Sequence, residues 1–97
     1  MWVANAADDT VTRIDLAGEV VGDPIPVGDN PRELAVGEGS VWVANAADNT
    51  VTRIDPATGE VAGEPIEVGE DPIGIAVGGG FVWTTNFRAD TLTKIRP

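Results

Sequence analysis

The side chains that most often carry out catalysis are missing from this sequence. It contains no histidine and no cysteine, which excludes a Ser-His or Cys-His pair, a histidine metal ligand and a thiolate site within the chain. Three glycines at positions 78–80 lie between two β-prone segments, without the lysine and the helix that a phosphate-binding loop requires. We therefore predict that the chain is not an enzyme, has no catalytic residues and uses no cofactor.

Acidic and amide side chains recur in short segments that separate β-prone runs. Calcium in proteins is held by about six to eight oxygens, several of them carboxylates of one loop, and no D-x-D-x-D-G pattern occurs here. Asp and Asn favour turns because they tolerate the left-handed backbone region and hydrogen bond to nearby amides. We predict turns and no metal site at these residues, which are Asp8, Asp9, Asp48, Asn49 and Asp90.

Tryptophan and asparagine recur at matching places. Each tryptophan lies beside a valine in a β-prone run, which is typical of core packing rather than of a platform for sugars or bases. The tryptophans are Trp2, Trp42 and Trp83. We expect the asparagines that follow these runs to hydrogen bond the turn backbone rather than a ligand, and they are Asn5, Asn45 and Asn86.

Arginine and aspartate alternate on the next β-prone run of the first two copies. The pairs are Arg13 with Asp15 and Arg53 with Asp55. Alternate positions of a strand lie on one face. We therefore predict a repeated ladder of surface ion pairs, each worth about 0–1 kcal/mol.

These recurrences have one cause, because the sequence repeats itself. The stretch VWVANAADNTVTRID at 41–55 occurs almost verbatim at 1–15 and in altered form at 81–96, so the spacing is 40 residues and then 41, with Thr58 as the extra residue. A fixed period of this length indicates stacked structural units. We divide a single domain, 1–97, into a repeat 1–40, a repeat 41–80 and a partial repeat 81–97.

Each repeat contains four β-prone segments and no helical period. The middle copy predicts a buried strand at 41–44, a second strand at 50–55 and an edge strand at 60–69, where Gly63 and Pro65 would not suit a central position. Segments 34–36 and 73–77 begin the next unit. Ten short strands result. Four antiparallel strands in about 40 residues describe a β-propeller blade, so we predict an all-β fold of about two and a half such repeats.

The same residues resemble a known family. VWVANAADNTVTRID, then PATGEV, then a VG-x-x-P segment leading to IAVG, is similar to the YVTN-type β-propeller repeat of bacterial surface and sensor proteins, over essentially the whole chain. The chain also resembles the repeats of the virginiamycin B lyase group, and repeats that accompany actinobacterial kinases and transport-related proteins. The resemblance implies a propeller that is often extracytoplasmic in bacteria, although the chain as given shows no signal peptide. It also implies, for the lyases, a histidine base with a divalent cation, and no residue here corresponds to that base.

Charge narrows the choice of partners. Sixteen acidic and six basic residues give a net charge of −10, which argues against nucleic acid and anionic membranes because both require clustered Lys and Arg. No apolar run approaches the length of a membrane span. An apolar share of 42% belongs to a globular chain.

One pair of residues departs most from the repeat. Arg32 and Glu33 correspond to Ile73 and Gly74 in the next copy. They precede the first strand of a unit, which we expect near the mouth of the propeller channel. We take Arg32 and Glu33 as candidate channel-mouth contacts, for a small-molecule or protein ligand that the sequence does not identify.

The order of the strands predicts how copies associate. The first set of strands lacks the strand that begins a blade, and the last set lacks the edge strand that ends one. We therefore expect a homo-oligomer that closes as a ring of three or four chains. We interpret the chain as a non-catalytic propeller module, a structural or binding scaffold, consistent with a truncated or engineered propeller that self-assembles. Two alternatives are a fragment of a lyase-like propeller enzyme whose catalytic residues lie in other blades, and a ligand-sensing propeller domain.

Overall fold

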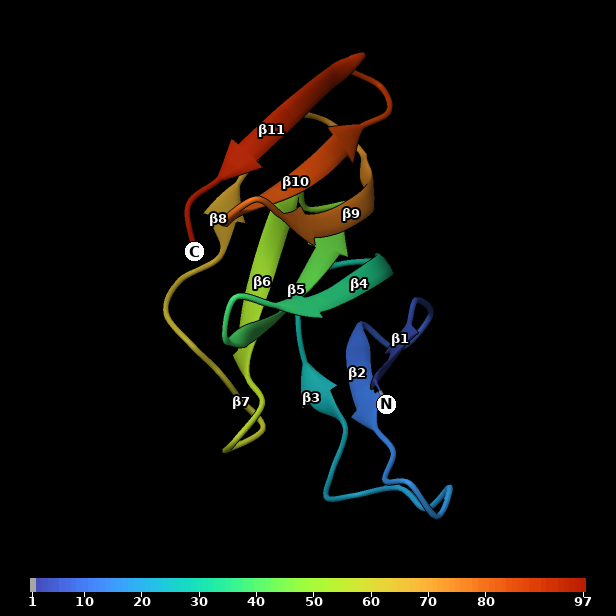
Figure 1. The fold of residues 1–97 in the computed structure, drawn as a ribbon. Coiled ribbons are helices and arrows are strands. Elements are labelled where there is room, and N and C mark those ends of the chain that lie inside the picture. The colour runs from blue at the N-terminus through green and yellow to red at the C-terminus, as the bar shows by residue number, and fades with distance from the viewer. Residues whose placement is uncertain (1) are drawn as a thin grey trace.

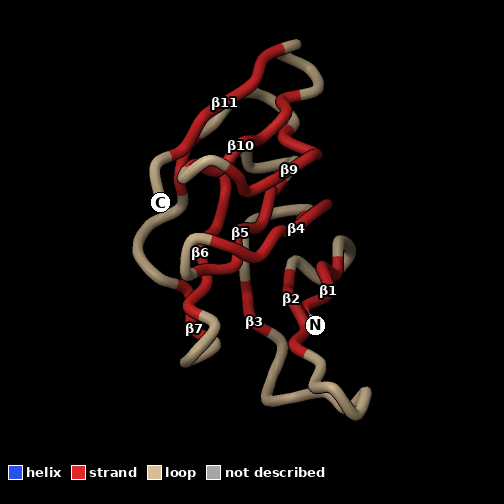
Figure 2. Tube along the Cα trace, in the orientation of Figure 1, coloured by secondary structure: helices blue, strands red, loops and turns tan. Residues whose placement is uncertain are grey.

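The computed structural model describes residues 2–97, and all regular structure in this part of the chain is β (Figure 1). Figure 2 shows strands joined by turns and loops. The described residues include no helix with the length and hydropathy needed to span a bilayer. The strands, in chain order, are β1 (Trp2–Asn5), β2 (Thr10–Arg13), β3 (Ile25–Pro26), β4 (Pro31–Gly37), β5 (Ser40–Asn45), β6 (Thr50–Asp55), β7 (Glu60–Val61), β8 (Ile66–Glu67), β9 (Pro72–Gly78), β10 (Phe81–Asn86) and β11 (Thr91–Ile95).

The strands form three antiparallel sheets, and each sheet is one blade or part of one. The middle blade is complete, with the order β4-β5-β6-β7 and with β8 also paired to β6. The first blade is β1-β2-β3 and the third blade is β9-β10-β11. The initial strands lie side by side, since β4 contacts both β9 and β1. The predicted all-β fold of antiparallel propeller blades is therefore confirmed.

The edge strand differs from the prediction. A single strand was expected over 60–69, but β7 and β8 form separately on two stretches of β6. Gly63 between them has φ +75° and Pro65 has no N–H to donate, so the ladder is interrupted there. The strands in the described chain are consequently eleven rather than ten. The edge of the first blade is interrupted in the same way, with an isolated bridge between Ile14 and Val20 before β3.

The predicted turns are confirmed by the backbone. Asp9, Asn49 and Asp90 occupy the same place in the three copies, and their φ angles are 59°, 58° and 53°. This left-handed region is the one that Asp and Asn tolerate better than most residues. The glycines at 79 and 80 have φ of 62° and 80° and form the β9–β10 hairpin turn, as expected.

The core consists of two apolar layers, one on each side of the middle blade. Successive residues of β5 alternate between these layers, because side chains of a strand point to opposite faces. The layer against the first blade contains Val11, Ile25, Val41, Val43 and Ile54. The layer against the third blade contains Trp42, Ala44, Val51, Ile75, Val82 and Ile95. The middle blade is apolar on both faces because both are covered.

Burial of the tryptophans follows from the same layers. Trp42 is fully buried, and its Nε1 donates to the Gly37 carbonyl at 3.0 Å. Trp2 and Trp83 are only half-buried. The prediction of interblade burial is thus confirmed for Trp42, whereas Trp83 lies on a face of the third blade that nothing covers among residues 2–97.

Proline substitutions test the strand order. Val43 pairs with both Leu34 and Thr52 in the centre of the middle blade. Val43→Pro should lower the free energy of unfolding by about 3 kcal/mol or more, because a central ladder bond is lost. Urea unfolding measures this.

The chain supplies its own control. Glu67 pairs with Thr50, and the residue in the same register of the first blade is Pro26, paired with Thr10. Glu67→Pro should therefore cost less than about 1 kcal/mol. Equal losses for the two variants would contradict an outer position for β8.

Candidate functional site

An asparagine at the same position of each blade holds two of its strands together. Asn45 Nδ2 donates to Thr50 Oγ1 at 3.2 Å and to Thr52 Oγ1 at 2.8 Å. The same two bonds recur at Asn5 with Thr10 and Thr12, and at Asn86 with Thr91 and Thr93. The prediction that these asparagines bond the turn backbone is wrong. Strand pairing sets Asn45 opposite Thr50, so the threonine hydroxyls across the ladder are the nearest partners.

A glycine of the preceding connector closes over each buried asparagine. A Cβ added at Gly28 would lie 2.7 Å from Asn45 Cγ, and one added at Gly69 would lie 2.7 Å from Asn86 Cγ. Asn45 and Asn86 each retain an Oδ1 that has no hydrogen-bond partner among residues 2–97. The connector seals these amides, so they fix how successive blades join and are not open to a ligand.

Turn carboxylates and amides of the first and middle blades accept hydrogen bonds from the connectors beside them. Asn30 N donates to Asp9 Oδ1 at 2.9 Å, and Asp71 N donates to Asn49 Oδ1 at 3.0 Å. Asp29 N also donates to Asp48 Oδ2 at 2.9 Å. These oxygens accept from backbone amides, and within residues 2–97 no group of acidic residues is arranged to hold a metal ion.

Three of these carboxylates lie near one another between the first and middle blades. The pKa of the Asp29 carboxyl is raised above its ordinary value, chiefly because the negative charge of Asp9 disfavours ionisation. Desolvation, a hydrogen bond with Asp9 and the charge of Asp48 act in the same direction, against a backbone hydrogen bond that lowers the pKa. Asp29 is exposed, so water and salt screen this repulsion.

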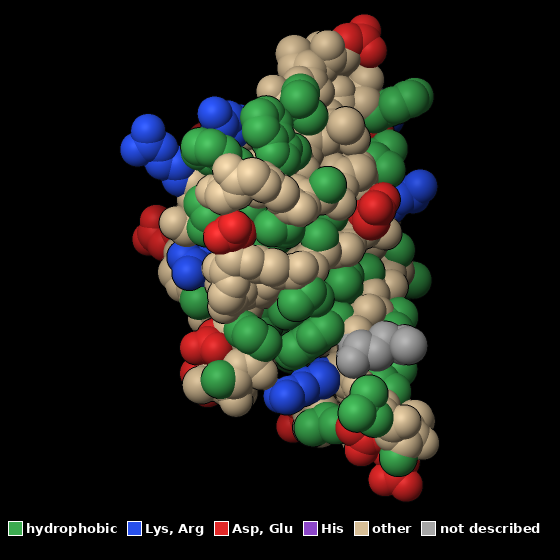
Figure 3. All heavy atoms as spheres, in the orientation of Figure 1, with side chains coloured by type: hydrophobic (Ala, Val, Ile, Leu, Met, Phe, Trp, Pro, Cys, Tyr) green, Lys and Arg blue, Asp and Glu red, His purple; other side chains and the backbone are tan. Residues whose placement is uncertain are grey.

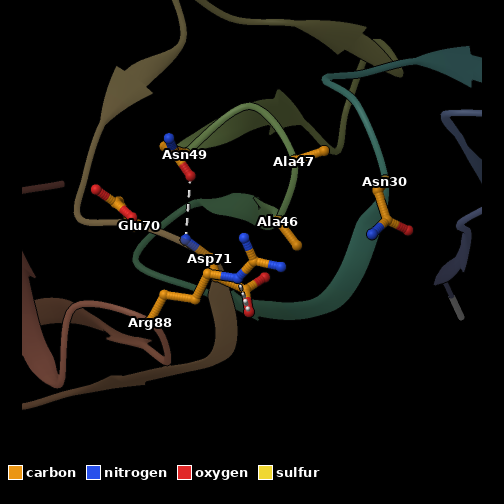
Figure 4. Close-up of a pocket in the computed structure, with 7 residues that line it drawn as sticks. All are labelled: Asn30, Ala46, Ala47, Asn49, Glu70, Asp71 and Arg88. Carbon is orange, nitrogen blue, oxygen red and sulfur yellow. Dashed lines mark hydrogen bonds and ion pairs between the residues drawn. The ribbon is translucent and has the colours of Figure 1, made fainter.

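A cavity of about 340 Å³ lies where the β5–β6 turn meets the connector to β9. It is lined by Asn30, Ala46, Ala47, Asn49, Glu70, Asp71 and Arg88. Figure 4 shows the Arg88 guanidinium reaching over Asp71, with Nε 3.9 Å from Asp71 Oδ2. The lining offers one guanidinium, two carboxylates and two amides. Such a set can hydrogen bond a small polar molecule but contains no nucleophile paired with a base.

The candidates named from sequence lie elsewhere. Arg32 and Glu33 are exposed in β4, where the register shifts between Pro31 and Glu33. Neither borders the cavity, and their contact with a ligand stays a prediction. The residue that was missed is Arg88. Its signal was present in the sequence, because Phe87 and Arg88 stand where the earlier copies have alanines at 46–47 and 6–7.

The predicted ladder of arginine–aspartate pairs is wrong. Arg53 pairs across the ladder with Trp42, so its guanidinium carbon lies 5.2 Å from the centroid of that ring, and its Nε donates to Ser40 Oγ at 2.8 Å. Arg13 lies over Trp2 at the same distance. Asp55 Oδ1 instead accepts from the Ala57 amide in the following turn. In the described part of the chain, Arg88–Asp71 is the one ion pair within 4 Å.

Comparison with known proteins supports the fold. No family profile matches the chain, and no curated protein sequence is significantly similar to it. The structure of hydrazine synthase from Kuenenia stuttgartiensis matches with a TM-score of 0.82 and 24% identity, over 88% of this chain and 25% of that one. Virginiamycin B lyase from Staphylococcus aureus, a β-propeller, matches with a TM-score of 0.68 and 15% identity, over 98% of this chain and 36% of that one.

A third solved structure adds to this pattern. It is a functionally unknown protein from Desulfotomaculum acetoxidans, with a TM-score of 0.64 and 18% identity, over 94% of this chain and 35% of that one. The chain thus spans a quarter to about a third of the length of these three structures. Identities this low show a propeller-like fold alone, and the YVTN-type assignment stays a prediction.

The glycine over Asn45 generates a stability prediction. Gly28→Ala should lower the free energy of unfolding by about 1–3 kcal/mol, because its methyl group would overlap Asn45 and Asp48 in a closed site. Gly78→Ala is the matched control, since no atom of the described chain beyond its sequence neighbours lies within 4 Å of an added Cβ there. Thermal unfolding of both variants measures the difference. Equal stability of the two would show that the connector does not press on the buried amide.

The raised pKa of Asp29 generates a pH prediction. A raised pKa means that the folded chain binds more protons than the unfolded chain, so this group's contribution to stability falls as pH rises through and above about 4. Asp29→Asn should raise the melting temperature at pH 7 and make its decline above pH 4 shallower. Glu64→Gln, at an exposed residue of the β7–β8 loop, controls for the loss of a charge. An unchanged pH profile in Asp29→Asn would contradict repulsion at this site.

Proposed function

We propose that the chain is a non-catalytic β-propeller module that acts as a structural scaffold, with blade faces that receive further blades. One observation carries the proposal. The middle blade is covered on both sides, and Trp42 and Val43 on its opposite faces are completely buried. The outer faces of the flanking blades are exposed, as Val3 is 38% and Leu92 58% accessible. Exposed apolar faces of this kind mark interaction surfaces.

Further copies of the chain supply the neighbouring blades in this proposal. Head-to-tail contacts between identical chains close into rings when the rotation permits, and a propeller has a fixed rotation per blade. The order of the strands predicts a ring of three or four copies. The scaffold is thus a homo-oligomeric ring.

The side-chain types of the sequence and of the cavity lining support a non-catalytic role. The sequence supplies neither histidine nor cysteine, and the lining of the cavity at Arg88 pairs no base with a nucleophile. A ligand-sensing role is a second candidate, favoured by that cavity. Its mixed charges suit a small polar molecule, which would bind beside the scaffold's blade contacts and not in place of them.

Light scattering tests the scaffold proposal. The purified chain should run as a discrete trimer or tetramer that persists on dilution, and Leu92→Glu should dissociate it because a charge would be buried in the contact. Leu16→Glu is the matched control, since Leu16 is fully exposed in the turn after β2. A monodisperse species of 10.1 kDa that unfolds cooperatively would contradict the proposal.

A further inference from the structure

We infer that the outer face of the third blade is a dedicated docking surface for the first blade of a second copy, in a head-to-tail contact. The inference rests on the proposed scaffold function and names its partner and its geometry. By "outer face" we mean the side turned away from the middle blade. The side chains concerned are Phe81, Trp83, Phe87, Leu92 and Lys94.

The pairing of the strands defines this face. Val82 and Ile95 of the third blade lie in the layer against the middle blade. Trp83 and Lys94, one position away on each strand, form the next cross-strand pair and so point to the opposite side. Leu92, two positions from Lys94 on β11, joins them and is 58% accessible. Phe87 follows β10 and is 70% accessible.

The corresponding face of the middle blade shows what covers such a surface. Trp42 and Val51, the counterparts of Trp83 and Leu92, are completely buried by the third blade. The chain therefore already contains two contacts of this type, between the first and middle blades and between the middle and third blades, and the partner in each is a blade of the same repeat. This favours another copy of the chain as the occupant over an unrelated protein.

The exposed face is nevertheless built differently from the covered one. Three residues are larger, since Phe81, Phe87 and Leu92 stand where the middle blade has Ser40, Ala46 and Val51. Ser40 and Ala46 are buried at the covered face. An added Cβ at the adjoining Gly37 would lie 2.7 Å from Val77 of the third blade. A partner with a first strand like β9 would leave no room for the larger side chains.

The first blade offers the space that this face needs. Its β1 pairs with β2 on one side, and no strand of the described chain pairs with its other edge. Within residues 2–97, β1 thus has no neighbour like β9, which carries Val77 in the internal contact. Val3 and Val20 are exposed on this blade, and Val43, the counterpart of Val3, packs toward a neighbouring blade. The aromatic side chains of a second copy's third blade can fill this place.

Two substitutions on the docking surface occur together. In the middle blade Arg53 Nε donates to Ser40 Oγ at 2.8 Å. In the third blade Lys94 replaces the arginine and Phe81 replaces the serine, and Lys94 Nζ lies 3.8 Å from the Phe81 ring centroid and 5.4 Å from that of Trp83. A cation–π contact replaces a hydrogen bond. The face therefore presents the positive charge of Lys94 above two aromatic rings.

Charge fixes the direction of the contact. Residues 81–97 contain three basic side chains and one acidic one, which are Arg88, Lys94, Arg96 and Asp90. Residues 2–30 contain six acidic side chains and one basic one, which are Asp8, Asp9, Asp15, Glu19, Asp23, Asp29 and Arg13. Figure 3 shows acidic side chains at the lower end, near the first blade, and basic ones at the upper left, near β11. Opposite ends attract and like ends repel, so head-to-tail docking is favoured.

Crosslinking of single-cysteine variants tests the direction. The chain has no cysteine, so Val3→Cys and Leu92→Cys each carry one thiol. A short bismaleimide added to an equal mixture should give mainly dimers that join the two variants, identified by peptide mass. Leu16→Cys, mixed with Leu92→Cys, should give at least about fivefold less product. Dimers that join Leu92→Cys to itself would overturn the inference, and so would dimers with no preference.

A face swap tests the specificity of the docking surface. The double variant Phe81→Ser/Lys94→Arg restores the residues of the covered face and should raise the dissociation constant at least about tenfold, with Leu16→Ser as the control. Retained far-UV circular dichroism shows that the variant is folded. The two failures differ. A 10.1 kDa wild-type monomer refutes the scaffold itself, whereas an oligomer that is insensitive to the swap refutes only the assigned face.

Discussion

A propeller blade cannot cover its own faces, and the rest of this structure depends on that constraint. A sheet with apolar side chains on both sides loses hydrophobic stabilisation unless a further layer lies on each side. The middle blade meets the requirement, with Trp42 toward one neighbour and Val43 toward the other, both fully buried. The flanking blades meet it on one side only. Their exposed faces follow from the same physics that buries the centre.

The connectors show how a short repeat places one blade on the next. In the first and middle blades, the turn of Asp or Asn residues serves its own hairpin through a left-handed residue and also accepts from an amide of a connector, as Asn49 does from Asp71. Beside it a glycine lies against the buried asparagine. A hydrogen bond contributes about 1 kcal/mol net, but a buried amide left unpaired costs more. Together these contacts make the relative position of the blades specific.

Differences among the copies separate architecture from individuality. Where the copies agree, as at the Asn–Thr bonds, the residues have a structural explanation within one blade. Where the third copy differs from the others, several of its residues lie at the surface. Arg88 borders the cavity, and Phe81 with Lys94 remakes the outer face of the third blade. All three of these residues belong to the third copy.

Sequence alone determined the repeat, the strand classes, the turns and the alternation that buries Trp42, because these depend on residues close together in the chain. Only the tertiary structure decided which side chains meet across a ladder or between blades. Register set Arg53 over Trp42 rather than beside Asp55, and set Asn45 against threonine hydroxyls rather than turn amides. The cavity at Arg88 and the repulsion between Asp9 and Asp29 depend on connectors that bring distant segments together. Such contacts are set by packing, which no local pattern specifies.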